Sequence, residues 1–443
     1  MRPARVFLLL IVLLFPLAGR AGDVSVENLR MWPAPDYTRL VFDLSAPAQY
    51  RLFTLKKPNR VVVDLDNARL SKPLPLLPAG NPLIADLRSS DRGANSVRIV
   101  IDLRKATQPR TFMLKPAGEY GNRLVIDLYD IKAAQASAKL EAQPVPRDSR
   151  DLIVAIDPGH GGEDPGAIGH LFHTREKDVV LAIGLDLKKL VDADPTMKAI
   201  MTRSGDYYVP LKERRRLARG ADVFISIHAD SMPGRGNHAH GSSVYALSEK
   251  GATTALAKAL ADDENASDWI GGVNLDNVDN DVGRVLGDLT KSATISDSLE
   301  LGDDMLPSLR RVAPLHTDSV AQAGFVVLKS PVPSVLIETA FISNPSDERK
   351  LRSKKFQEEM ARGIYAGLKR AEPWLLARRG VPLNTAHASA THEDYIVRPG
   401  DTLTAIARAH DVQVEALRAT NNLQSSSLPV GLRLRIPAPG GNS

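Results

Sequence analysis

Two histidines and two glutamates in the middle of the chain stand where a hydrolase would place its reactive groups. His160 and His228 each come at or just beyond the end of an apolar run typical of a buried strand, and Glu338 closes a third such run. Glu176 stands at the expected start of a helix. Ligands of open α/β sheets bind at the carboxyl ends of strands, so these side chains are candidates for one site.

The residue types favour metal-dependent hydrolysis. His160, Glu176 and His228 form a set of two histidines and one glutamate, which suits catalytic zinc because it leaves one coordination position open. The same set could hold other divalent ions. A zinc hydrolase also needs a base for its water, and Glu338 after a buried strand is the candidate.

Other interpretations of the same residues stay open at this point. Glu176 could simply complement the dipole of the helix that it opens. Glu338 could cap the following turn, and each histidine could be a hydrogen-bonded structural residue. A phosphate-binding loop at 157–162 is disfavoured, because the Gly-Lys-Ser/Thr ending of a P-loop is missing.

The composition limits what the chain can be. Its 443 residues, 43% hydrophobic and 25% charged, are ordinary for a globular protein and suffice for two to four domains. The absence of cysteine excludes disulfides, thiolate metal ligands and a cysteine nucleophile. The formal charge of +5 includes three arginines in a segment that we expect to be removed, and the remainder is too small to indicate nucleic-acid binding.

The N-terminus has the pattern of a signal peptide. Arg2 and Arg5 precede the apolar run 6–17, and small residues follow up to Ala21. The run is too short for a comfortable membrane span, and no later run is long enough. We therefore expect residues 1–21 to be cleaved and the mature protein to be exported without a stable membrane span. An uncleaved anchor is the alternative.

Residues 23–130 are predicted to form an N-terminal all-β sandwich. One pattern, an aliphatic run that starts with Arg and ends with Asp-Leu, occurs four times, with Pro and Gly between the copies. The recurring aspartates could form a binding row, but pairing with the recurring arginines or capping of strand ends is favoured. These aspartates are Asp43, Asp64, Asp102 and Asp127.

Residues 151–370 alternate strand-like and helix-like runs between two predicted linkers, 131–150 and 371–393. This alternation predicts a central α/β domain with a mostly parallel sheet. One helix is expected at 178–191. The expected strands are 152–156, 223–227, 242–247, 325–328 and 335–337.

Four motifs of this central domain closely resemble the zinc-dependent N-acetylmuramoyl-L-alanine amidases of the periplasmic cell-division type. The motifs are 156–162, 174–178, 226–230 and 336–344. The resemblance implies that His160, Glu176 and His228 bind one zinc ion and that Glu338 is the catalytic carboxylate. It also implies hydrolysis of the amide between N-acetylmuramic acid and the L-alanine of the stem peptide, in daughter-cell separation and wall remodelling.

The flanking segments resemble modules that bind the cell wall. Residues 23–130 are similar to an AMIN domain, which implies targeting to the septal wall or envelope. Residues 394–437, which begin with the run from Tyr395 to Asp401, resemble a LysM module. That resemblance implies a small βααβ fold that binds glycan, so we expect peptidoglycan to be the macromolecular partner.

About sixty residues separate the helix expected at 255–262 from the strand expected at 325, more than a loop needs. The resemblance implies that an insertion of about 264–312 blocks the metal site until a LytM-type activator protein displaces it. Our hypothesis is that Glu264 occupies the open zinc position at rest. A helical decoration packed on the sheet is the alternative. His316 also resembles family positions, and the sequence suggests no role for it.

Two other functions remain open on sequence alone. A zinc peptidase would cut within the stem peptides, and a non-catalytic protein would bind peptidoglycan or activate another enzyme. The presence of all four catalytic-type residues argues against the second.

Overall fold

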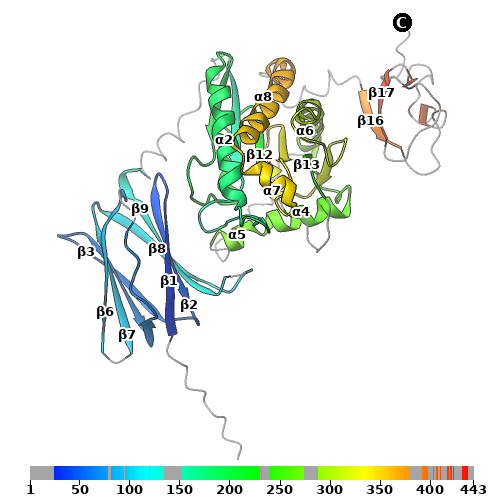
Figure 1. Ribbon diagram of the computed structural model, residues 1–443. Helices are drawn as coiled ribbons and strands as arrows, with labels where there is room; N and C mark the ends of the chain where they lie inside the picture. Colours follow the sequence, from blue (N-terminus) through cyan, green and yellow to red (C-terminus); the bar gives the residue numbers. More distant parts are fainter. Residues whose placement is uncertain are drawn as a thin grey trace, which may run out of the picture. The chain divides into compact units, whose positions relative to one another are not determined.

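The computed structural model describes three folded parts of the chain (Figure 1). The predicted signal peptide and most of the two predicted linkers lie outside the described residues. Within the described residues, no helix is both long and apolar enough to cross a membrane. The structure describes residues 24–77, 81–93, 95–118, 120–133, 151–229, 231, 239–273, 288–378, 392–397, 403, 406–407, 410, 417–418, 420–421, 423 and 432–437.

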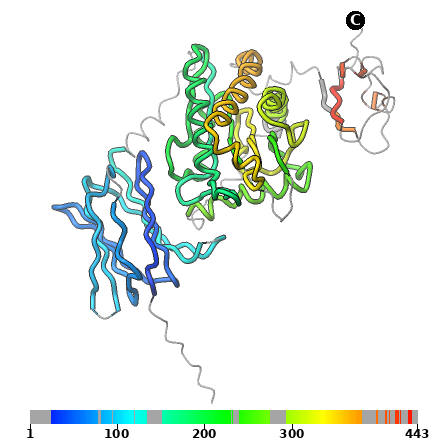
Figure 2. The backbone as a smooth tube through the Cα atoms, viewed as in Figure 1, coloured from blue at the N-terminus to red at the C-terminus, as the bar shows by residue number. Residues whose placement is uncertain are grey.

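The first part is a sandwich of two sheets, blue to cyan in Figure 2. The sheets have the strand orders β5-β1-β2-β9-β8 and β3-β4-β7-β6, and every pair is antiparallel except β1 with β5. The four repeated runs are the central strands β2, β4, β7 and β9, as predicted. The strands are β1 Val24–Pro33, β2 Tyr37–Leu44, β3 Tyr50–Leu55, β4 Arg60–Asp66, β5 Ala68–Leu70, β6 Ile84–Asp91, β7 Ser96–Leu103, β8 Thr107–Leu114 and β9 Asn122–Asp130.

The recurring arginines and aspartates face each other across these central strands. Antiparallel pairing sets the Arg that starts one strand opposite the Asp that ends its neighbour, so Arg39 pairs in register with Asp127, and Arg98 with Asp64. Two nitrogens of Arg39 donate to the Asp127 carboxylate at 2.7 Å each. The favoured interpretation, ion pairing, therefore holds for these residues. The other two aspartates bind different arginines, in the pairs Arg30–Asp43 and Arg88–Asp102.

The buried pair predicts a strong effect of Asp127→Ala on the sandwich. The variant would leave Arg39, 9% exposed, without its counter-charge, which costs about 3–5 kcal/mol. Asp43→Ala is the matched control, because its pair with Arg30 is 20% and 23% exposed and is worth about 1 kcal/mol. Hydrogen exchange of the β2 and β9 amides in the full chain measures both losses. Equal losses would contradict the role of burial.

The second part is built on a six-stranded sheet of order β11-β10-β12-β15-β13-β14. The strands β11, β10, β12 and β15 run parallel, and β13 is antiparallel to β15. The mostly parallel sheet that the sequence predicts is thus present. The strands are β10 Leu152–Pro158, β11 Met197–Met201, β12 Val223–His228, β13 Ser243–Leu247, β14 Ala321–Ala323 and β15 Ser334–Glu338.

One predicted strand is wrong. The apolar run 325–328 is not a strand, since it contains the short 3-10 helix η3, Val326–Leu328, and the edge strand β14 lies just before it. Phe325 and Leu328 are nevertheless buried, in the core under one face of the sheet. A short buried apolar run has the same sequence pattern in a strand and in a helical turn.

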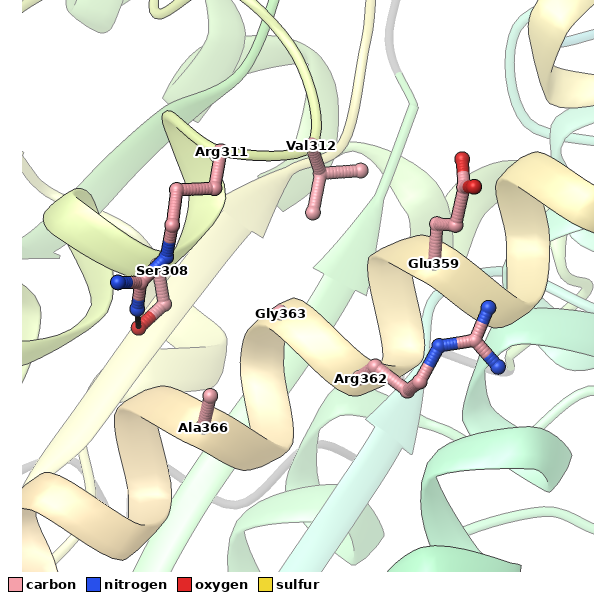
Figure 3. Close-up of a pocket in the computed structure, with 7 residues that line it drawn as sticks. All are labelled: Ser308, Arg311, Val312, Glu359, Arg362, Gly363 and Ala366. Carbon is pink, nitrogen blue, oxygen red and sulfur yellow. Dashed lines mark hydrogen bonds between the residues drawn. The ribbon is translucent and has the colours of Figure 1, made fainter.

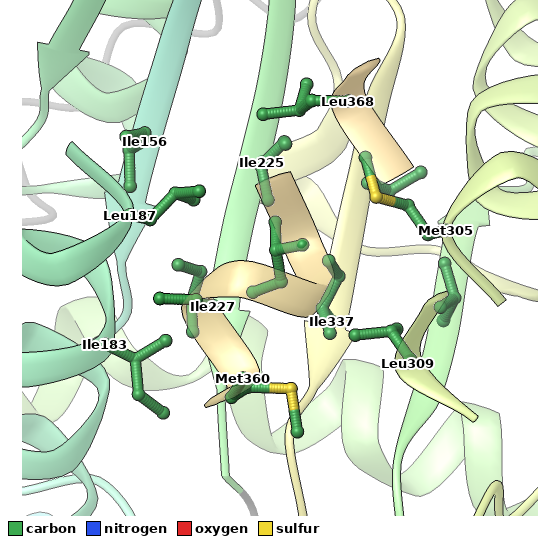
Figure 4. Close-up of a cluster of buried hydrophobic side chains, with 14 of the residues drawn as sticks. Ile156, Ile183, Leu187, Ile225, Ile227, Met305, Leu309, Ile337, Met360 and Leu368 are labelled. Atoms are coloured by element: carbon green, nitrogen blue, oxygen red, sulfur yellow. The ribbon is translucent and has the colours of Figure 1, made fainter. Parts of the chain in front are cut away.

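Alternate residues of β10 enter two cores on the two faces of the sheet. Leu152, Val154 and Ile156 pack with helices α2, α6 and α8, whose side chains Figure 4 shows. Ile153 and Ala155 pack with α3 and α4 on the other face. This alternation follows from the two-residue period of a strand. The helices are α2 Glu176–Ala193, α3 Leu211–Ala218, α4 Ala255–Asn265, α5 Ser267–Ile270, α6 Asp288–Leu309, α7 Pro345–Leu351 and α8 Lys354–Ala377.

Two boundaries differ from the sequence predictions. The linker expected from residue 371 begins later, because α8 continues to Ala377 and buries Ala371 and Leu375 in the core. Within the expected insertion 264–312, helix α6 is part of the hydrophobic core, since Leu301, Met305 and Leu309 are buried against α8 and the sheet. For α6 the alternative of a helix packed on the sheet therefore holds. Residues 274–287 of the insertion lie outside the described residues.

The third part is the small C-terminal module. Its strands β16 His392–Ile396 and β17 Arg433–Pro437 pair antiparallel. Helical residues between them contribute to one apolar core, as expected of a βααβ unit. The core consists of Val397, Leu403, Ile406, Ala407, Leu417, Leu434 and Ile436.

Candidate metal centre

The end of β10 carries the first predicted ligand on a strained turn. His160 has φ +58°, a left-handed conformation that non-glycine residues seldom adopt. Gly159 before it allows a close approach, since a Cβ there would stand 2.2 Å from Cε1 of His228. The two imidazole rings consequently lie edge to face with their centroids 4.9 Å apart. Strained backbone at such a position is typical of functional sites.

Four buried side chains converge at this point. His160, Glu176, His228 and Glu264 each place one ligand atom within 4.8 Å of the others. Glu176 lies between the histidines, with one oxygen 3.2 Å from Nε2 of His160 and the other 3.2 Å from Nδ1 of His228. Oε1 of Glu264 lies 3.4 Å and 3.1 Å from the same two nitrogens. The four residues come from the β10 loop, α2, β12 and α4.

Neighbouring groups fix the orientation of these ligands. Asp164 accepts a hydrogen bond from Nδ1 of His160 at 2.8 Å, which leaves Nε2 as the atom that faces the cluster. Backbone N–H groups of Ala167 and Ala229 donate to the two oxygens of Glu176 at 2.9 and 2.8 Å. Such outer partners hold metal ligands in one orientation.

The donor set fits a divalent cation. Nε2 of His160 is buried and makes no hydrogen bond to any described residue, which is costly for a polar atom unless another group binds it. Two imidazole nitrogens and a carboxylate are also the ligand types that zinc takes at catalytic centres.

The charges in the cluster respond to its burial and to one another. Burial alone would lower the pKa of His228, but Glu264 and Glu176 outweigh it and raise the pKa to about 10. Burial raises the pKa of Glu264, yet His228 and His160 bring that pKa down to about 2. Without a cation the histidines thus carry protons that neutralise the carboxylates. A metal ion would replace those protons.

Glu338 stands beside this cluster on the adjoining strand. It ends β15 in register with His228 of β12, so both side chains lie on the same face of the parallel pair. The carboxylate is fully buried and is not one of the four clustered ligand groups. The N-terminus of α7 is capped by Asn344, which accepts hydrogen bonds from the N–H groups of Ser346 and Asp347.

Two buried arginines, which sequence reasoning missed, fasten the His160 loop. Arg214 donates to Asp157 at 2.9 Å and to the carbonyl of His160 at 2.7 Å. Arg203 donates to the carbonyls of Pro158 and Gly159 at 2.9 and 2.7 Å. Their sequence positions give no sign of this, because both arginines follow the loop by more than forty residues. Asp164 had a weaker signal, its four-residue spacing from His160.

His316, for which the sequence suggests no role, lies at the same edge of the sheet. Its N–H donates to the carbonyl of Ser242 at 2.7 Å, and its ring packs edge-on against Phe341. Ser243, which follows Ser242 in the chain, pairs in register with Glu338, so His316 is bound to the strand beside that of Glu338.

A separate hollow lies between α6 and α8 (Figure 3). Its volume is about 330 Å³, and no residue of the cluster lines it. It therefore belongs to the helical layer and not to the candidate site. Its lining residues are Ser308, Arg311, Val312, Glu359, Arg362, Gly363 and Ala366.

The orienting role of Asp164 predicts weaker metal binding in Asp164→Ala. Loss of the hydrogen bond to His160 frees the ring to rotate, and such losses cost about 10–100-fold in metal affinity. Zinc affinity measured by competition with a chelating dye tests this expectation. Asp178→Ala, an exposed carboxylate in the first turn of α2, is the control and should bind zinc like the parent protein. Unchanged affinity in Asp164→Ala would contradict the assigned role.

The α/β fold, with a buried two-histidine, two-glutamate cluster at the carboxyl edge of its sheet, defines the central domain as that of a candidate metallohydrolase. Residues 154–370 match the family described as N-acetylmuramoyl-L-alanine amidase, residues 28–128 the AMIN domain and residues 395–437 the LysM domain.

Known relatives cover most of the chain. The N-acetylmuramoyl-L-alanine amidase AmiC of Escherichia coli O6:H1 is 41% identical over 391 residues, which cover 81% of this chain and 93% of the relative. AmiC of Neisseria meningitidis serogroup B is 39% identical, over 79% and 91% of the two chains. A crystal structure of the Clostridium difficile 630 amidase covers 51% of this chain and 98% of its own, with 26% identity and a TM-score of 0.38.

The chain belongs to the N-acetylmuramoyl-L-alanine amidases. It is an enzyme that hydrolyses the amide between N-acetylmuramic acid and the L-alanine of the stem peptide. The predicted AMIN and LysM resemblances are also confirmed, and these domains indicate binding to peptidoglycan.

Proposed function

We propose that the amidase holds one zinc ion with His160, Glu176 and His228 and uses Glu338 as its catalytic carboxylate. The observation that carries this proposal is the convergence of four buried side chains that include these three ligands. One of the converging atoms, Nε2 of His160, has no hydrogen-bond partner among the described residues. When bound, the zinc ion would act as a Lewis acid toward the scissile carbonyl and the attacking water.

In this proposal the protein's own residues move the protons. Glu338, buried beside His228, takes a proton from the attacking water and passes it to the nitrogen of L-alanine as the amide bond breaks. Asp164 holds His160, and the backbone N–H groups of Ala167 and Ala229 hold Glu176, in fixed orientations during these steps. The products are the free glycan and a stem peptide that begins with L-alanine.

Glu338→Gln tests the role of the carboxylate apart from metal binding. The amide side chain has a similar shape but is not a base, so we expect amide hydrolysis to fall by about 100-fold or more while zinc affinity is kept. Mass spectrometry of fragments released from purified peptidoglycan measures the activity. A chelator should abolish release by the parent protein, and Glu359→Gln on α8 is the control. Full activity of Glu338→Gln would overturn the assignment.

We further propose that Glu264 blocks the site at rest. Its carboxylate lies 3.1–3.4 Å from both histidines, where it would occupy the position that substrate or water needs. The end of α4 is held there by Asn265, which donates to the carbonyl of Gly324 at 3.0 Å and accepts from the N–H of Val326 at 2.7 Å. A LytM-type activator protein that binds only the displaced state would shift the population toward an open site.

This block predicts that Glu264→Gln raises basal activity. The neutral side chain binds a metal ion and charged histidines less well, so the resting state loses stability. The release of stem peptides should increase about 10-fold, the equivalent of about 1.4 kcal/mol. Asp263→Asn, an exposed neighbour on the same helix, is the control. Basal activity equal to the parent's in Glu264→Gln would show that this residue does not close the site. A point variant is used in place of a deletion of the insertion 264–312, because that deletion would remove α6 from the hydrophobic core.

The remaining assignments concern location and domain limits. We propose that residues 1–21 direct export to the periplasm and that the AMIN domain, 23–130, places the enzyme at the septum. The catalytic domain would extend from residue 151 to the end of α8 at Ala377 and the LysM module over 394–437, with linkers at 131–150 and after α8. The relatives named AmiC and the presence of two wall-binding domains support this arrangement.

A further inference from the structure

An apolar surface is displayed on the loop that leads into Glu176. Ile168, Leu171 and Phe172 are 38%, 49% and 41% exposed. Among the described residues, only five other large apolar side chains are as exposed, and none of those has another within ten positions of it. Single exposed apolar residues are ordinary, but a cluster of them marks a binding surface. We call residues 168–172 the loop tip.

The loop tip is held in place by a buried carboxylate. Glu348 of α7 is fully buried and accepts hydrogen bonds from the backbone N–H groups of Leu171, Phe172 and Thr174 at 2.9, 2.9 and 3.2 Å. Gly169 allows this contact, because a Cβ there would stand 2.1 Å from Oε1 of Glu348. Glu348 thus fixes the backbone of Leu171 and Phe172, so these exposed apolar side chains stand on a held backbone.

The same loop is tied to the metal centre. Ala167, the residue before the loop tip, donates its N–H to Oε2 of Glu176 at 2.9 Å and accepts from the N–H of Glu176 at 2.9 Å. Leu171 is four residues further on, so its backbone lies within about 14 Å of Ala167. The loop tip is therefore close enough to touch the substrate next to the bond that is cleaved.

The charges around the loop tip are basic. The guanidinium of Arg352 lies over the ring of Phe172, 4.2 Å from its centroid. The two acids of α7, Asp347 and Glu348, are buried and bound internally, whereas Arg349 on the same helix is exposed. The surface thus combines an aromatic ring, aliphatic side chains and unburied cations.

We propose that the loop tip and Arg352 form a glycan subsite of the catalytic domain, next to the muramic acid residue whose amide is cleaved. Leu171 and Phe172 would lie against the apolar C–H face of a sugar ring, and Arg352 would face a carboxylate of a stem peptide. Peptidoglycan offers both groups on one chain, in line with the apolar and basic character of this surface. The inference rests on the amidase activity and adds a substrate contact to it.

The double variant Leu171→Ala/Phe172→Ala tests this subsite by kinetics. The KM for soluble glycan chains that carry stem peptides should rise about tenfold, the equivalent of about 1.4 kcal/mol. Hydrolysis of a muramoyl peptide with a single sugar should keep its kcat/KM, because it lacks the neighbouring ring. Leu76→Ala, 97% exposed and far away in the chain, is the control. Equal loss on both substrates, or no loss on either, would overturn the proposal.

Hydrogen exchange gives a second, local measurement in full-length Glu338→Gln protein. Added glycan chains should slow exchange of the Leu171, Phe172 and Thr174 amides, and the single-sugar peptide should not. Protection of these amides by neither ligand would overturn the subsite. A double variant that is normal on all purified substrates but no longer responds to cell extract would also overturn it, in favour of protein docking. Inactivity of both the parent protein and Glu264→Gln on both substrates would instead contradict the amidase function itself, because Glu264→Gln removes the proposed block.

Discussion

The catalytic end of the sheet depends on a buried ion pair between Asp157 and Arg214. Asp157, the penultimate residue of β10, is fully buried and also accepts hydrogen bonds from Thr202 and Ser226 at 2.6 and 2.8 Å. Arg214 reaches it from α3 and binds the carbonyl of His160 as well. A buried charge is tolerated only when it is paired and hydrogen-bonded. This pair therefore joins β10, β12 and α3 in the one arrangement that holds the strained His160 turn.

A second constraint is the concentration of charge next to that turn. Two carboxylates and two imidazoles share one buried space, and without a cation they must exchange protons among themselves to remain neutral. The two histidines come from the ends of neighbouring strands and Glu176 comes from α2, whereas Glu264 comes from the end of α4. Glu264 is the fourth group of the cluster and is not one of the three proposed zinc ligands, so the proposed resting block is assigned to it.

The two buried acids of helix α7 connect the strand of Glu338 to the loop that precedes Glu176. Helix α7 follows Glu338 by a few residues, and both of its acids accept hydrogen bonds inside the protein. Asp347 accepts from the N–H of Gly241 at 2.8 Å, and Glu348 accepts from the loop before Glu176. The strand that carries the proposed base and the loop that carries a ligand are thus joined through one short helix. Arg349 on this helix and Arg352 just after it are exposed, so the exposed charges at this helix are basic.

The sequence by itself indicated most of the element types and the alternating faces of the strands, because these follow from periodicity. It also singled out His160, Glu176, His228 and Glu338 as candidates, from their places at strand and helix ends together with the family resemblance. It did not determine the Arg203 and Arg214 clamps, the helical turn at 326–328 or the burial of α6. Each of these depends on contacts between residues far apart in the chain, which no local pattern records. Only the tertiary structure could decide that Glu264 meets both histidines, since that contact needs the end of α4 and two separate strands to converge at one point.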